Sequence, residues 1–147
     1  DEIYKPHVDA GLKKAGKSTA DFDIAPTVSV VLTDNLDIGY NMLRPMLALY
    51  IGGMGAKGKN FYNDLAVRYG YADAAAKIQE LYLSRRQGEA MMAVPNELID
   101  DVALVGTRAR IKEHLQLWLD SPVTTLNMTV FDNKTLQTMV ELIAELT

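Results

Sequence analysis

The sequence predicts a mostly helical α/β fold with parallel strands. Two stretches rich in β-branched residues, Ile24–Thr33 and Val123–Phe131, lack helical periodicity and are typical of buried strands. A helical pattern follows each stretch, which is the order found in β/α units. Because two parallel strands leave the edges of a sheet uncovered, we expect them to require neighbours that the chain does not supply. The prediction is therefore two substantial strands, adjacent and parallel, in an incomplete sheet.

Helical patterns occupy most of the remaining chain. They span Glu2–Ala15, Leu36–Ile51, Asn60–Gly70, Tyr71–Arg86, a short segment that starts near Pro95, a segment capped by Thr107, and about Lys134–Leu146. Pro45 lies inside the second of these and is expected to kink or split it, because proline removes a helical hydrogen bond. Gly70 is expected to end the third. The twenty residues from Gln87 to Gly106 are interpreted as a turn, the short helix and a break at Gly106.

Apolar spacing predicts which residues share a face in the last two helices. The helix after Thr107 should bury Ile111 and Leu115 together with Trp118 or Leu119. In the final helix, Leu136, Val140, Ile143 and Leu146 are expected to lie on one face.

Composition excludes several classes of protein. The 147 residues are 48% hydrophobic, which suits a packed domain rather than a disordered chain. Charges of both signs are spread along the chain and sum to −4, so neither nucleic acid nor a membrane surface is expected as a partner. No apolar run reaches the roughly 18 residues that a membrane span needs. The absence of cysteine excludes disulfides and thiolate zinc sites, and a cytoplasmic location is expected.

The stretch "GMGAKGKN", from Gly53 to Asn60, has the spacing G-x-x-x-x-G-K of a phosphate-binding loop. Asn60 stands where that motif needs a hydroxyl ligand for Mg²⁺, and a helical pattern rather than a strand precedes it, so a nucleotide site is disfavoured. Two interpretations stay open. Gly52, Gly53, Gly55 and Gly58 could form sharp turns between packed helices. Alternatively, the segment is a mobile loop in which Lys57 and Lys59 face an anionic ligand, with Met54, Gly55 and Asn60 beside them.

Other polar residues give weaker patterns. His7 and His114 have no second ligand at metal-binding spacing, so no metal site is expected. The pair Asp100 and Asp101 is interpreted as part of a solvated helix face. Arg108 and Arg110 open a helix, where cations are slightly unfavourable, and this mismatch hints at an anionic partner nearby.

Five segments together resemble a known family: "IAPTVSVVLTDN", "YNMLRPMLALYIGGMG", "KNFYNDLAVRYGY", "ELIDDVALVGTRARIKEHL" and "PVTTLNMTVF". In their order and spacing they resemble the C-terminal part of the luciferase-like monooxygenase family, and most of all its F420-dependent oxidoreductase branch. The resemblance implies a (β/α)₈ barrel, in which Ile24–Thr33 would be strand seven and Val123–Phe131 strand eight. A whole barrel typically has about 250 residues, so residues 1–147 would form one segment of a longer chain, a fragment that lacks strands one to six.

The resemblance also implies a function. It implies hydride transfer between coenzyme F420, or alternatively FMN, and an organic small-molecule substrate, in which the cofactor carries the chemistry. Most cofactor contacts in the family lie in early strands, so no catalytic residue is assigned and the 147 residues alone are expected to be inactive. A homo-oligomer, or association with the missing barrel half, is expected. The alternative is a non-catalytic helical interaction or regulatory domain.

On the barrel interpretation, Asp34 and Asn35 are the best-placed polar residues of the first strand. They follow its C-terminal end, and the C-terminal ends of barrel strands carry the active site. The simpler alternative is that they cap the helix that follows. Both residues are therefore candidates for cofactor or substrate binding.

Overall fold

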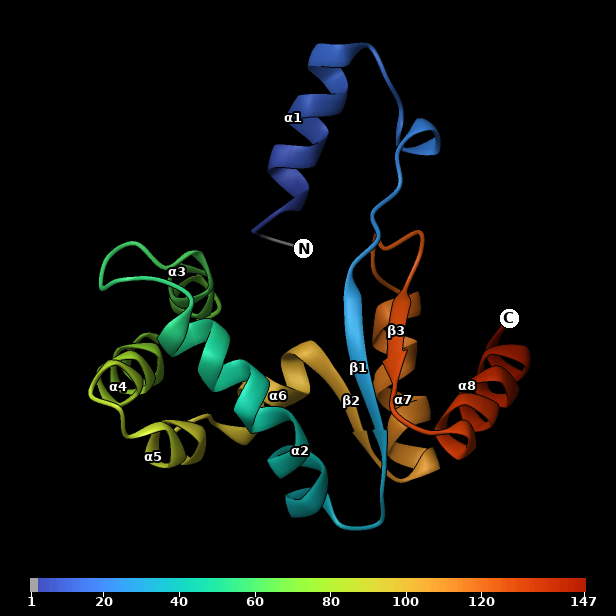
Figure 1. Ribbon diagram of the computed structural model, residues 1–147. Coiled ribbons are helices and arrows are strands. Elements are labelled where there is room, and N and C mark those ends of the chain that lie inside the picture. The colour runs from blue at the N-terminus through green and yellow to red at the C-terminus, as the bar shows by residue number, and fades with distance from the viewer. Residues whose placement is uncertain (1–2) are drawn as a thin grey trace. The chain divides into compact units, whose positions relative to one another are not determined.

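A computed structural model describes residues 3–147 (Figure 1). The chain divides into two compact units. The sheet unit consists of residues 1–34 and 104–147, and the helical unit of residues 35–103. The predicted helix Glu2–Ala15 is observed as α1, Lys5–Ala15, with Pro6 in its first turn; Glu2 lies outside the described residues.

The sheet contains three strands rather than the two predicted. They are β1 (Thr27–Leu32), β2 (Ala103–Gly106) and β3 (Asn127–Val130), in the order β2-β1-β3 (Figure 1). Strands β1 and β3 lie side by side and are parallel, with Thr27 opposite Asn127, which confirms the predicted pair. Both strands are shorter than predicted.

The sequence predicts only a break at Gly106 here, so strand β2 is an element that the prediction lacks. All four of its residues are buried, and it begins directly after the last residue of α6 (Asn96–Val102). A short apolar run of this kind cannot be told from the end of a buried helix by periodicity alone. The strand is fixed instead by its place beside β1, where the Thr33 N–H donates to the Gly106 carbonyl at 2.9 Å.

The core of the sheet unit lies between the sheet and two helices, α7 (Arg108–Leu119) and α8 (Asn133–Leu146). The α7 helix begins as predicted, because the Thr107 hydroxyl accepts from the Arg110 N–H at 3.4 Å. The buried members of this core are Val28, Val30, Leu104, Ile111, Leu115, Met139 and Leu142. The predicted stripe on α7 is confirmed for Ile111 and Leu115, with Trp118 packed against the core and Leu119 exposed.

The four residues predicted to share one face of α8 differ in exposure, because Leu146 packs against the core and the other three are exposed. Leu136, Val140 and Ile143 are 47%, 61% and 39% exposed, whereas Thr135, Met139 and Leu142 are buried. The apolar arc of α8 is wider than the face that meets the sheet, so spacing alone could not decide which part of the arc is covered.

The helical unit contains α2 (Leu36–Ala48), α3 (Phe61–Arg68), α4 (Ala72–Leu83), α5 (Gln87–Met92), α6 and the short π-helix η2 (Leu49–Gly53). Its largest buried side chains include Ile78, Val94 and Ile99. Gly70 follows the C-terminal end of α3, as predicted, and has a left-handed φ of 96°. Helix α2 is not split at Pro45; the change in helix type comes at Leu49. Helix α5 lies where only a turn was predicted.

Candidate functional site

The Gly-rich segment follows a helix and a π-helical turn, not a strand. Residues 54–60 connect η2 to α3, so the geometry of a phosphate-binding loop, which follows a strand, is not present. The turn itself is informative, because π-helical segments are rare and frequently lie at functional sites. Residues 49–62 are therefore the candidate site of the helical unit.

Asn60 anchors this segment through all of its side-chain polar atoms. The side chain is 1% exposed. Its Nδ2 donates to the carbonyl oxygens of Tyr50 and Ile51, both at 2.9 Å. Its Oδ1 accepts from the N–H groups of Tyr62 and Asn63, at 3.0 and 3.2 Å. Asn60 thus caps the end of η2 and the start of α3 at once, and satisfies four backbone groups that helix ends leave unpaired.

Asn63 adds a second anchor that was not among the predicted site residues. Its Nδ2 donates to the carbonyl oxygens of Ile51 at 3.1 Å and Ala75 at 2.8 Å, which ties α3 to both η2 and α4. The signal in the sequence is the repeat of Asn at three-residue spacing, since residues i and i+3 lie on one side of a helix. The base of the loop is therefore held from both ends.

Two glycines of the segment make close contacts with Tyr82 of α4. A Cβ atom added to Gly52 would lie 2.5 Å from Tyr82 Cβ, and one added to Gly53 would lie 2.5 Å from Tyr82 Cε1. Gly55 packs similarly against the backbone of Lys59 and Asn60. These contacts support the interpretation of the glycines as sites of close helix packing. Gly58 differs, because it has a φ of 74° and open space around it.

The tip of the loop carries the two predicted cations. Lys57 and Lys59 are exposed and make no ion pair with any residue of the range 3–147. Met54 beside them is 52% exposed. An aromatic group that the prediction missed follows at once: Phe61 is 64% exposed and packs edge-on against Tyr62, whose ring centre lies 4.6 Å from that of Tyr50. The tip thus presents positive charge and exposed aromatic rings on a fixed base.

Asp34 belongs to the sheet unit and Asn35 to the helical unit. Asp34 is exposed and follows β1 in the sheet unit. Asn35 is the N-cap of α2 in the helical unit, and its Oδ1 accepts from the Ile38 N–H at 3.2 Å. The capping interpretation is confirmed for Asn35, whereas Asp34 remains a candidate for ligand binding.

The Asp100–Asp101 pair is partly engaged by tyrosine hydroxyls. The Tyr40 hydroxyl donates to the Asp100 carboxylate at 3.0–3.1 Å, and the Tyr71 hydroxyl donates to Asp101 Oδ2 at 2.6 Å. Burial of the phenol, and then this hydrogen bond to a carboxylate, raise the pKa of Tyr71 to about 12. The interpretation of the pair as a purely solvated face is therefore incomplete, because these carboxylates link α6 to α2 and to the start of α4.

The cations at the start of α7 have partners within the sheet unit. Arg108 pairs with Glu145 of α8, and Lys112 pairs with the same carboxylate at 2.9 Å. Hydrogen bonds from Arg108 first, and then from Lys112, lower the pKa of Glu145. Arg110 donates to the Val105 carbonyl at 2.6 Å. The cations at the start of this helix therefore pair with groups of the chain itself, so they do not require an external anion.

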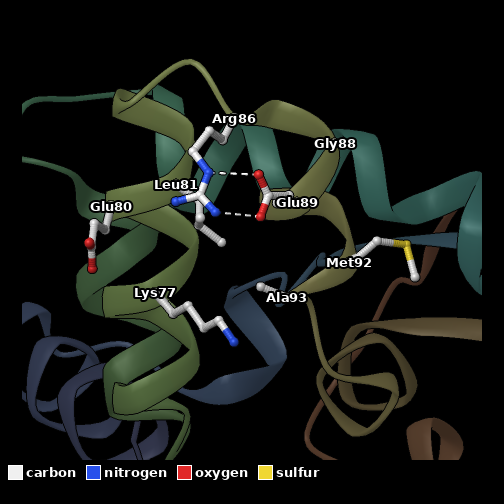
Figure 2. Close-up of a pocket in the computed structure, with 8 residues that line it drawn as sticks. All are labelled: Lys77, Glu80, Leu81, Arg86, Gly88, Glu89, Met92 and Ala93. Atoms are coloured by element: carbon white, nitrogen blue, oxygen red, sulfur yellow. Dashed lines mark hydrogen bonds and ion pairs between the residues drawn. The ribbon is translucent and has the colours of Figure 1, made fainter.

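A hollow of about 700 Å³ lies between α4 and α5 of the helical unit, apart from the predicted residues (Figure 2). Its lining includes Lys77, Leu81, Arg86, Glu89 and Met92. Arg86 forms a two-point pair with Glu89, and this hydrogen bond lowers the pKa of the Glu89 carboxyl. The two charges compensate each other, so the hollow offers no strong charge preference to a ligand.

Among residues 3–147 no three histidine, aspartate or glutamate side chains gather as metal ligands would. In the same described part of the chain, no helix is both long and apolar enough to cross a membrane.

Comparison with known proteins identifies the family. The model of the luciferase-like monooxygenase family matches residues 2–125. The chain is 35% identical over 129 residues to a Mycobacterium tuberculosis protein named "Putative coenzyme F420-dependent oxidoreductase Rv3520c". The matched residues are 86% of this chain and 37% of that protein. Its fold is similar to that of the coenzyme F420-dependent tetrahydromethanopterin reductase of Methanopyrus kandleri, with a TM-score of 0.68 at 19% identity.

That structural match covers 95% of this chain and 39% of the reductase chain. The chain therefore spans well under half the length of both relatives. Because the family model covers most of the 147 residues, the chain belongs to the luciferase-like monooxygenase family.

Proposed function

We propose that this chain is the C-terminal part of a coenzyme F420-dependent oxidoreductase, which transfers hydride between F420 and an organic substrate. The observation that carries the proposal is the 35% identity over 129 residues to a protein named as F420-dependent. The order of motifs along the chain, from the first strand to "PVTTLNMTVF", supports the assignment to the C-terminal part. F420 is proposed ahead of FMN because both relatives are named for F420.

The proposal places β1 and β3 as neighbouring strands of a (β/α)₈ barrel. Their parallel pairing supports this, since every strand of such a barrel is parallel to its neighbours. Strand β2 follows β1 in the chain but lies on the edge of β1 opposite β3, so this edge departs from the sequential strand order of a complete barrel. The remaining strands would come from the part of the protein that this chain does not span.

The residues at the loop tip fit one feature of such a cofactor or its substrate, an anionic group. Lys57 and Lys59 offer two exposed ammonium groups, and the base formed by Asn60 fixes where the tip starts and ends. Bound F420 would supply the hydride chemistry. The role of the loop tip would be to bind and orient an anionic group of the cofactor or substrate. An exposed loop cannot alone shield the reacting ring of a cofactor from water.

Titration of F420 into the full-length protein tests the proposal. Absorbance and fluorescence of the cofactor should change with saturation, and FMN titrated in parallel should bind more weakly. Full-length protein should oxidise or reduce F420 with a suitable organic substrate, whereas the 147 residues alone should not, because they lack most of the loops that form the active face of a barrel. Saturable binding of FMN without F420 would reassign the cofactor, and binding of neither would overturn the function.

A further inference from the structure

Helix α2 continues directly into η2, and one side of it is used up within the helical unit. The buried residues of this side are Gly39, Tyr40, Leu43 and Ala48. The Tyr40 hydroxyl donates to the Asp100 carboxylate of α6, which fixes this side of α2 against the rest of the unit. The other side of α2 is therefore left to face outward from the core of the unit.

That other side carries an apolar strip. Four side chains follow one another at spacings of four, four and three residues, so they align along the helix: Ile38, Met42, Met46 and Leu49. Among the described residues nothing covers them, since each is between 41% and 57% exposed.

Aromatic rings extend the strip beyond Leu49. The ring of the next residue, Tyr50, lies 4.6 Å from that of Tyr62, which in turn lies 5.4 Å from that of Phe61. Tyr62 and Phe61 are 39% and 64% exposed. We call the four strip residues together with Phe61 and Tyr62 the α2 patch. It exposes roughly 600 Å², taking about 200 Å² for each large side chain.

Charged side chains are absent from the exposed side of α2 along the patch. Of the exposed residues between Ile38 and Ala48, only Asn41 is polar, and none is charged. Single exposed apolar residues are common, but a contiguous patch of this size is at the upper end of what a monomer exposes. Depletion of charge within such a patch is typical of the core of a protein–protein interface.

We propose that the α2 patch is an interface between two copies of this protein related by a twofold axis. In such an interface the same surface of each copy meets itself. A straight strip on a helix can do this, because α2 laid antiparallel on α2 of the second copy brings strip against strip. Side chains at spacings of three and four form the ridges by which two helices pack. Met42 and Met46 lie near the middle, where flexible side chains fill irregular gaps.

The exposed area fits a second copy. A standard interface buries roughly 800 Å² on each partner, and about 65% of that area is apolar in homodimers. Each copy therefore needs about 500 Å² of apolar surface, and the α2 patch supplies roughly 600 Å².

A further segment of the same chain fits the patch less well. The helices between β1 and β2 already bury a core of their own, which includes Ile78 and Ile99, so α2 needs no additional segment to complete it. A tethered segment also needs little area, because the connection gives it a high effective concentration. The size and neutrality of the patch instead match a partner that binds from solution.

Sedimentation equilibrium of the full-length protein tests the interface without reference to F420. The unmutated protein should sediment at micromolar concentration with twice the mass of its Met42→Lys variant. The dissociation constant between copies should rise at least about a hundredfold, because the twofold axis places two new charges in one buried contact. Met42→Leu keeps an apolar side chain of similar volume and should retain the full mass.

The matched control is Met92→Lys on α5, which makes the same substitution in the same unit at a side chain that is 68% exposed. It should leave the mass unchanged. An unmutated protein that sediments as a single chain would overturn the proposal without any variant. A Met42→Lys variant that keeps the full mass would overturn it too, even with a lowered thermal midpoint, since a segment of the same chain would then cover the patch.

Discussion

The Nδ2 amide of Asn60 lies 2.9 Å from the carbonyl oxygen of Ile51 and ties the start of α3 to the end of the π-helical turn. In a phosphate-binding loop this position would hold a metal-binding hydroxyl. Here the same position holds an amide, which can donate to two carbonyls and accept from two N–H groups at once. The residue that breaks the nucleotide motif is thus the one that closes this loop.

Replacement of Asn60 should separate its two capping roles. Asn60→Ser keeps an acceptor for the N–H groups of α3 but loses both donors to η2, whereas Asn60→Ala loses both roles. We expect Asn60→Ala to cost about 2–4 kcal/mol of unfolding free energy, the sum of a lost cap and unpaired buried carbonyls, and Asn60→Ser to cost less. Urea denaturation of the full-length protein measures both. Equal losses for the two variants would show that the bonds to η2 carry the whole effect.

The glycines before the loop should differ in their tolerance of a methyl group. At Gly52 the added Cβ would meet the Cβ of Tyr82, which is fixed to the α4 backbone, while at Gly53 it would meet the edge of the Tyr82 ring, which can move. Gly52→Ala should therefore destabilise by about 2 kcal/mol or more, and Gly53→Ala by less.

The control for these glycines is Gly88→Ala, since nothing lies within 4 Å of a Cβ at that position of α5. Alanine there should be neutral or stabilise by up to about 1 kcal/mol. The three variants can be compared by the midpoint of denaturation. A tolerated Gly52→Ala would mean that α4 and η2 are less closely packed than described.

Sequence reasoning succeeded where a local signal decides the structure. Thr107 and Gly70 mark helix ends through their own backbone chemistry, and both are confirmed. The parallel pair of β1 and β3 was predictable because both segments are rich in β-branched residues and each is followed by a helix. These features depend on residues close together in the sequence.

It failed where the answer depends on distant parts of the chain. The four residues of β2 become a strand because β1 lies beside them, and no local pattern shows that. The covered side of α8 depends on where the sheet and α7 lie, so the apolar spacing of the helix could not show that Val140 is exposed. For the candidate site, Lys57 and Lys59 were visible as cations near glycines, but the fourfold bonding of Asn60 and the exposed ring of Phe61 were not.

The hydroxyl of Tyr71 should stabilise the fold only while it is protonated. Its pKa in the folded protein, about 12, lies above the ordinary value of 10.0, so the stabilisation is complete below about pH 10 and is lost as the pH rises towards 12. Tyr71→Phe should cost roughly 1.5 kcal/mol at neutral pH, the low end for a hydrogen bond to a charged group, and less near pH 11.

Urea denaturation at several pH values measures this loss for Tyr71→Phe. Tyr62→Phe is the control, because the Tyr62 hydroxyl makes no hydrogen bond with the described residues and its removal should cost little at any pH. A cost for Tyr71→Phe that stays constant up to pH 11 would contradict the role of the Asp101 bond.

The last prediction concerns the two lysines of the loop tip. Replacing both, as Lys57→Ala with Lys59→Ala, should weaken binding of the cofactor or of an anionic substrate to the full-length protein. One lost charge-assisted contact is typically worth about 1.5–3 kcal/mol, or roughly ten- to a hundredfold in affinity. Stability should hardly change, because exposed lysines contribute little to it. The double change Lys13→Ala with Lys14→Ala removes the same charge from α1 and should leave binding intact. The dissociation constant for F420 and the KM for the substrate are measured for the loop variant and for the α1 control. If the loop variant matches the α1 control in both constants, the loop serves only to connect η2 to α3, and the anionic group must be bound elsewhere in the protein.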